Sequence, residues 1–152
     1  MAFLGAVGAR VRDFYTSLNA PRGLTWMDNL VACNPPDYRP PRPDEIAACR
    51  PRIIETINLV DPDLILTMGK EAITALTGRR DPIETLRGKF YRATIPGRYA
   101  EYEIPVFSTL HPGQFLHNPD PSPNGIEALW ERDFRKAVEV VVTLKQARER
   151  TK

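Results

Sequence analysis

Histidine and cysteine, the residue types most suited to proton transfer and metal binding, are rare in this 152-residue chain. The histidines are His111 and His117, and the cysteines are Cys33 and Cys49. His111 precedes a proline that stiffens the next turn, so its imidazole could be held as a hydrogen-bond donor. A lone histidine is otherwise an ordinary core or surface residue. Fifteen residues separate the cysteines and no clustered partners accompany them, which argues against a zinc site. They are therefore either buried thiols or ligands of another metal.

Basic residues gather in the segment 79–98, which has six basic residues and two acidic ones. The whole chain has 21 basic and 19 acidic residues. Its net charge of +2 is too small to indicate a polyanionic partner. The basic segment is either a solvated loop face or a patch that meets phosphates.

Alternating helices and strands would position these residues. The spacing of apolar residues predicts helices over 7–18, 43–60, 70–77 and 126–147. Apolar runs predict strands over 24–32, 64–68 and 104–109. Strands that alternate with helices predict an α/β fold, a three-layer αβα arrangement around a mostly parallel sheet.

Several candidate residues fall at the carboxyl ends of these predicted strands. The segment 29–33, Gly69 and His111 lie at or near such ends. Ligands of parallel α/β sheets bind beyond the carboxyl ends of the strands, so a site is expected there. Asn29 has a plainer interpretation as a residue that caps the turn after its strand.

Composition limits the class of protein. The 42% content of hydrophobic residues suits one globular domain over 1–152, although 15 prolines are about twice the usual share. No apolar run approaches the ~18 residues of a membrane-spanning helix, and the first residues do not resemble a secretory signal. We therefore expect an intracellular protein in a reducing compartment, with no membrane contact.

Five stretches, taken in order, carry a family resemblance. They read Ala-Phe-Leu-Gly-Ala-Val-Gly at 2–8, Asn-Leu-Val-Ala-Cys-Asn-Pro-Pro at 29–36, Pro-Asp-Glu-Ile-Ala-Ala-Cys-Arg-Pro at 43–51, Leu-Arg-Gly at 86–88 and Thr-Leu-His-Pro-Gly-Gln-Phe-Leu-His-Asn-Pro at 109–119. In order and spacing they resemble the family-four uracil-DNA glycosylases, the iron–sulfur members of the uracil-DNA glycosylase superfamily. The resemblance covers nearly the whole chain.

This resemblance implies an enzyme of base excision repair that hydrolyses the N-glycosidic bond of uracil in DNA. Asn29 would recognise the flipped uracil, because one amide matches both the O4 acceptor and the N3 donor of that base. Phe3 would stack on the base. His111 would donate to O2, where negative charge builds as the bond breaks.

The same resemblance implies residues that contact the DNA. Independently of the resemblance, the charge of the basic segment predicts that Arg87 and Lys89 meet phosphates; His117, where the family often has arginine, could do so as well. Phe115 and Leu116 would form an apolar wedge that replaces the flipped base. The plainer interpretations are packing under the loop for Phe115 and Leu116 and an ordinary surface position for His117.

Cys33 and Cys49 match two cysteines of the family's four-iron four-sulfur cluster, which needs four thiolates. Family members also carry an upstream strand that ends in Gly-Glu-x-Pro-Gly, and two further cysteines, and this chain has neither. We therefore expect an N-terminally truncated domain that lacks an internal strand. The chain as given would bind no cluster, whereas a longer form could bind one.

Two other functions stay open at this point. The chain could be a non-catalytic DNA-binding or regulatory relative that has lost the first catalytic motif, or a generic nucleotide-binding α/β domain. If it is the enzyme, we expect a monomer that acts on uracil-containing DNA.

Overall fold

The computed structural model describes residues 5–20, 23 and 25–150. Its elements are α1 (Ala6–Ser17), the 3-10 turn η1 (Pro36–Tyr38), α2 (Pro43–Val60), β1 (Ile65–Met68), α3 (Lys70–Thr77), α4 (Ile83–Leu86), β2 (Phe90–Pro96), β3 (Glu101–Thr109), α5 (Gly113–His117) and α6 (Ile126–Arg150). The four predicted helices and the predicted strands over 64–68 and 104–109 are confirmed, with small differences in their ends.

The sheet is built around β3, which lies between β1 and β2. β1 runs parallel to β3, with Ile65 opposite Val106. β2 runs antiparallel to β3, with Phe90 opposite Phe107. Two of the three strands thus point the same way, and the α/β class is confirmed. The hairpin of β2 and β3 was not predicted, because β2 lies inside the basic segment and its apolar residues alternate with polar ones.

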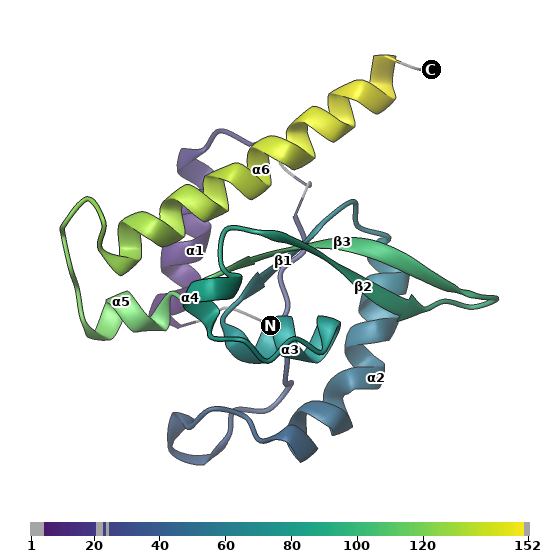
Figure 1. Cartoon of the computed structure of the whole chain (residues 1–152), viewed down its shortest axis with the longest axis horizontal. Helices are drawn as coiled ribbons and strands as arrows, with labels where there is room; N and C mark the ends of the chain where they lie inside the picture. Colours follow the sequence, from purple (N-terminus) through teal and green to yellow (C-terminus); the bar gives the residue numbers. More distant parts are fainter. Residues whose placement is uncertain (1–4, 21–22, 24, 151–152) are drawn as a thin grey trace.

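Helices cover both faces of this sheet (Figure 1). One core joins the sheet to α2, α3 and α4, and its buried residues are Ile57, Ile73, Ile83, Leu86, Ala93, Ile95, Ile104, Val106 and Leu110. The other core joins α1, α5 and α6, and its buried residues are Val11, Phe14, Phe115, Trp130 and Phe134. In β1, Ile65 packs against the first core and Leu66 against the second. This alternation gives the predicted three layers.

The predicted strand over 24–32 is wrong for the residues that the structure describes. Residues 25–29 have no regular structure and residues 30–33 form bends. A strand is stable only when a neighbouring strand pairs its backbone N–H and C=O groups. The described sheet ends at β1, and no described segment pairs with the outer edge of that strand. Apolar composition alone was therefore not enough to form this strand.

Candidate functional site

A groove of about 1790 Å³ opens along β1 and reaches the residues that follow β3. The segment 25–30 lines one side of it, and α6 contributes residues such as Val138 and Val141. Asn29, His111 and His117 all line this groove. Three of the predicted site residues therefore border one groove, and their joint action on a ligand stays a prediction.

His111 lies two residues beyond the end of β3, exposed between two buried neighbours, Leu110 and Pro112. The backbone N–H of Gly113 donates to Nδ1 of His111 over 3.1 Å. Nδ1 is therefore an acceptor, and in the neutral ring the proton must lie on Nε2. Burial lowers the pKa of His111, although the carboxylate of Glu71 acts in the opposite direction. Both effects together leave a neutral imidazole whose free N–H can donate.

Gly69 supports the His111 side chain from the end of β1. Its N–H donates to the carbonyl of Thr109 over 2.9 Å, which joins the ends of β1 and β3. Its φ of 92° and ψ of 167° lie in a region that only glycine adopts readily. A Cβ at this position would lie 3.1 Å from Cβ of His111. The absence of a side chain at Gly69 thus makes room for the histidine.

Asn29 is exposed, and it lies in the segment that forms no strand. Its backbone N–H donates to Asp28 over 2.7 Å, and its carbonyl accepts from Arg52 of α2 over 2.5 Å. Arg52 also forms an ion pair with Asp28. Within the described residues the side-chain amide of Asn29 has no hydrogen-bond partner, so it is available to a ligand.

The predicted wedge must be corrected. Phe115 is 2% exposed and packs against Trp130, with 5.4 Å between ring centroids. It belongs to the core and cannot enter DNA without unfolding α5. Leu116 is 39% exposed, and its role in a wedge stays a prediction. Phe3, the predicted stacking residue, lies outside the described residues.

The predicted phosphate contact of Arg87 must also be corrected. Its Nε donates to Oδ2 of Asp133 over 2.9 Å and its Nη2 donates to Oδ1 over 2.5 Å. Nη2 also donates to the carbonyl of Leu129 over 3.2 Å. The guanidinium therefore pairs with Asp133 inside the protein. A buried carboxylate without a charged partner costs more free energy than a phosphate that water solvates. Lys89 is exposed, and its contact with phosphate stays a prediction.

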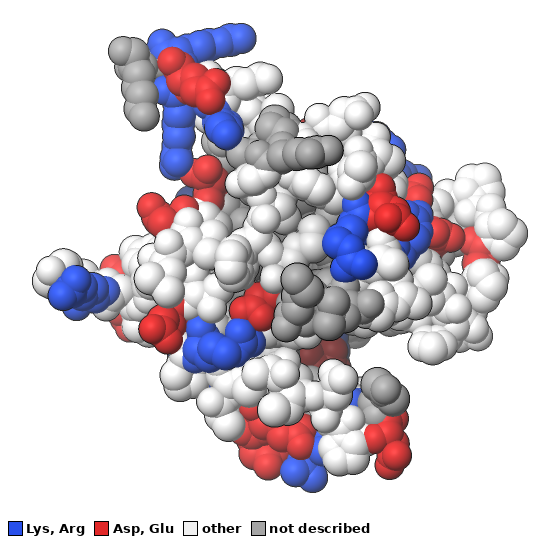
Figure 2. All heavy atoms as spheres, turned by 180° about the vertical axis from the view of Figure 1, so that it is seen from behind, with Lys and Arg blue, Asp and Glu red and all other residues white. Residues whose placement is uncertain are grey.

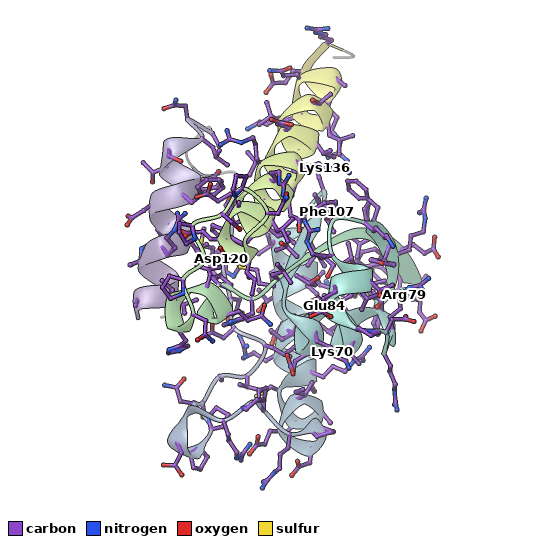
Figure 3. All side chains as sticks on the ribbon, turned by 60° about the vertical axis from the view of Figure 1, so that its left-hand side comes forward. Lys70, Arg79, Glu84, Phe107, Asp120 and Lys136 are labelled. Carbon is purple, nitrogen blue, oxygen red and sulfur yellow. The ribbon has the colours of Figure 1, made fainter. Side chains whose placement is uncertain are left out.

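The basic segment as a whole is less cationic on the surface than its composition suggests. Arg92 forms an ion pair with Glu103, and Arg79 lies over the ring of Tyr91 at 4.7 Å. Figure 3 shows Arg79 on the opposite side of the molecule from Asp120, which lies in the loop after α5. On the face in Figure 2, basic and acidic side chains are interspersed. Of the six basic side chains in the segment 79–98, those of Arg79, Arg87 and Arg92 therefore contact other residues of the protein.

A family model described as the uracil DNA glycosylase superfamily matches residues 1–134. The chain belongs to the uracil DNA glycosylase superfamily. The resemblance inferred from the sequence is therefore confirmed at the level of the family.

Three relatives in this superfamily are named Type-4 uracil-DNA glycosylase. The protein from Sulfurisphaera tokodaii is 32% identical over 149 residues, which cover 95% of this chain and 64% of the relative. The protein from Saccharolobus solfataricus is 35% identical over 144 residues, or 91% of this chain and 62% of the relative. The protein from Pyrobaculum aerophilum is 32% identical over 121 residues, or 77% and 60%. The chain spans about three fifths of the length of these relatives.

The cysteines of this superfamily member do not by themselves fit a four-iron four-sulfur cluster. Cys33 is exposed in a bend and Cys49 is half-buried in α2, and both are free thiols. Among the described residues, no group of three or more histidine, cysteine, aspartate or glutamate side chains could hold a metal ion. Two thiolates are half of what such a cluster needs. Within the described part of the chain, no helix is long and apolar enough to cross a membrane.

Two residues near the site were missed by the sequence analysis of this superfamily member. Asp133 is 5% exposed and pairs with Arg87, and Arg52 holds the backbone at Asn29. A signal for Asp133 was present, because the residue stands between Trp130 and Phe134 on the apolar face of its helix. For Arg52 the sequence held no signal, because its partners lie more than twenty residues away.

Proposed function

We propose that this superfamily member hydrolyses the N-glycosidic bond of uracil in DNA. The hydrogen bond from the Gly113 N–H to His111 Nδ1 carries this proposal, because it leaves the Nε2 proton of a neutral imidazole for a ligand. The groove that holds His111 also holds Asn29. A donor for the leaving base and an amide that can read a base edge thus both border this groove, which supports the proposal.

In the proposed reaction, water adds to C1′ of the sugar and the uracil leaves with the electron pair of the N-glycosidic bond. Negative charge develops on the uracil O2, where the His111 N–H donates a hydrogen bond. Because its lowered pKa keeps the ring neutral at pH 7, His111 acts as a donor rather than as a cation. The proton released by the water goes to solvent.

Asn29 would recognise the base before the bond breaks. Its amide N–H can donate to O4 of uracil and its carbonyl can accept from N3. Cytosine presents the reverse pattern and would be rejected. Asp28 is held by Arg52, so it is not free to orient the water.

The partner that fits these residues is uracil-containing DNA. Lys89 and His117 are the exposed side chains proposed to contact phosphates, and Leu116 is proposed to occupy the space left by the flipped base. We expect the protein to act as a monomer inside the cell, where its substrate is found. If a longer form binds a four-iron cluster, Cys33 and Cys49 would supply two of its ligands, and no step of the reaction is assigned to it.

The test is the release of uracil from an oligonucleotide that contains one deoxyuridine, measured with the full-length protein. We expect His111→Ala to slow release by on the order of 10²-fold while DNA binding is retained, as loss of one positioned donor does elsewhere. His117→Ala is the matched control, because it removes the other histidine of the chain, and it should change release far less. Equal effects of the two variants would contradict the proposed role of His111.

A second candidate function is that of a DNA-binding relative without catalysis. The position of Asn29 in an unpaired segment favours it, because a base pocket needs a rigidly held amide. This protein would bind DNA with an affinity that falls as salt rises, yet release no uracil. The same oligonucleotide experiment separates the two candidates.

A further inference from the structure

Asp133 is a carboxylate placed in the core of the molecule. It lies in α6 between Trp130 and Phe134 and is 5% exposed. Burial of an unpaired carboxylate costs several kcal/mol, so a residue at this position must be both paired and hydrogen-bonded. Apolar residues of similar size commonly stabilise a folded protein at least as much as a buried ion pair does. The charge at Asp133 therefore calls for a reason other than stability.

The partners of Asp133 come from two other elements. Arg87, just after α4, meets both carboxylate oxygens through Nε and Nη2 in a two-pronged ion pair. Thr109, the last residue of β3, donates its hydroxyl to Oδ2 over 2.9 Å. A Cβ at Gly88 would lie 3.0 Å from Oδ1, so the chain after Arg87 passes tightly against the same carboxylate. Three elements are thus joined at one side chain.

The hydroxyl contact matters because of where Thr109 lies. Thr109 is fully buried, its carbonyl accepts from Gly69, and His111 is two residues further along the chain. Its side chain is therefore held by α6 and its backbone by the end of β1. On the same face of the sheet, the Lys136 ammonium lies 5.5 Å from the ring centre of Phe107, close to it in Figure 3. This contact also connects α6 to the last part of β3.

We propose that Asp133, together with Arg87 and Thr109, is a positioning cluster that holds the His111 imidazole in the groove. This inference rests on the proposed function, in which His111 donates to the leaving base. The cluster does not touch the substrate. It sets where β3 ends and therefore the direction in which His111 leaves the sheet. A displacement of about 1 Å at such a donor can cost on the order of 10²-fold in rate.

The experiment compares three threonine variants of the full-length protein. Thr109→Val keeps the shape of the side chain and removes its hydroxyl, and Thr109→Ser returns the hydroxyl. Thr77→Val is the matched control, since it removes a hydroxyl that donates to Ile73 over 2.7 Å in α3. We expect Thr109→Val to lower kcat for uracil release about tenfold with KM unchanged. Thr109→Ser should restore kcat, and Thr77→Val should leave it unchanged.

A second readout does not depend on activity. The chain has two histidines, so a proton NMR titration with His117→Gln as reference assigns the His111 signal. In the parent protein, desolvation lowers the pKa of His111 below its ordinary value. The negative charge of Glu71 raises this pKa, but by less. In Thr109→Val and in Asp133→Asn this pKa should move back toward its ordinary value, because a displaced ring loses the neighbours that desolvate it. A role limited to stability would lower the melting temperature and leave the His111 titration in place.

These readouts separate the two proposals. If the parent protein releases no uracil, the proposed function fails, and the NMR titration still decides whether the cluster positions His111. If Asp133→Asn does not fold, Thr109→Val decides. An unchanged His111 titration in Thr109→Val, or an equal change in Thr77→Val, would overturn the positioning cluster.

Discussion

The two sides of the groove are held in different ways. His111 follows a strand that is paired on both edges, and its neighbours Leu110 and Pro112 are buried. Asn29 lies in a segment without strand pairing, where Arg52 binds its carbonyl and pairs with its neighbour Asp28. Backbone pairing therefore fixes the strand that His111 follows, whereas one long side chain holds the backbone at Asn29. Substitutions near His111 should change geometry, and substitutions near Asn29 should change recognition.

The largest effect is expected at Gly69, on the His111 side. Gly69→Ala forces a Cβ to 3.1 Å from His111 in a backbone conformation that costs about 1–3 kcal/mol for other residues. We expect uracil release to fall on the order of 10²-fold, because the ring must shift. Gly78→Ala is the control, since it too has positive φ but nothing within 4 Å. Urea unfolding and uracil release measure the two effects, and equal losses of activity would contradict the role of Gly69.

A smaller effect on rate is expected at Asn29, with a change in specificity. Asn29→Asp replaces the amide donor by a carboxylate, which repels O4 of uracil when it is ionised. Uracil release should fall by about 10- to 100-fold, and the preference for uracil over cytosine should relax. Parallel assays on oligonucleotides with either base measure this. Undiminished release that is still specific for uracil would remove Asn29 from the base site.

Arg52→Ala tests what holds Asn29 in place. The variant releases the backbone of Asn29, so KM for the oligonucleotide should rise about tenfold while kcat changes little. Stability should change by no more than about 1 kcal/mol, because the ion pair with Asp28 is partly exposed. Arg42→Ala serves as the control, since it breaks an exposed ion pair with Asp44 at the start of α2. A fall in kcat with KM unchanged would show that the two sides of the groove do not differ as described.

Lys89→Ala should affect DNA binding alone. Loss of one phosphate contact lowers the slope of log affinity against log salt by about one. Arg150→Ala, at the end of the long helix α6 that projects from the body in Figure 1, should leave the slope unchanged. Fluorescence anisotropy at several salt concentrations provides the measurement. An unchanged slope in Lys89→Ala would withdraw this residue from the DNA contacts.

The smallest effect concerns Glu45, at the start of the helix that carries Arg52. The hydrogen bond from Arg39, with a further one from the Arg42 backbone, lowers the pKa of Glu45 to about 2. Because the folded pKa lies below the unfolded value of about 4.5, its stabilising effect is present above pH 4.5 and is lost as pH falls toward 2. Urea unfolding at several pH values measures this effect. Between pH 4.5 and 2 the free energy of unfolding should depend less on pH in Glu45→Gln than in the parent protein, and Asp44→Asn should behave like the parent. A pH dependence in Glu45→Gln as steep as that of the parent protein would contradict this prediction.

Much of the fold could be read from local patterns. The helices at each end of the chain and the strands over 64–68 and 104–109 were predicted, because an apolar stripe or run reports directly which residues face a core. His111 was placed correctly at the end of a strand for the same reason. Asp133 was missed although it lies on an apolar helix face, because its partners Arg87 and Thr109 belong to other elements.

Only the tertiary structure decided which strands pair and which side chains contact one another. The segment 25–32 has the composition of a strand, yet strand formation depends on a neighbour elsewhere in the chain. Arg87 was predicted to face DNA, and Phe115 was predicted to enter it, because charge and apolarity in a sequence do not tell which surface a side chain meets. Asp133 lies 46 residues beyond Arg87, and only folding brings them within hydrogen-bond distance. Short-range periodicity thus determined the elements of this protein, while contacts between residues distant in the chain decided which side chains remain free to act.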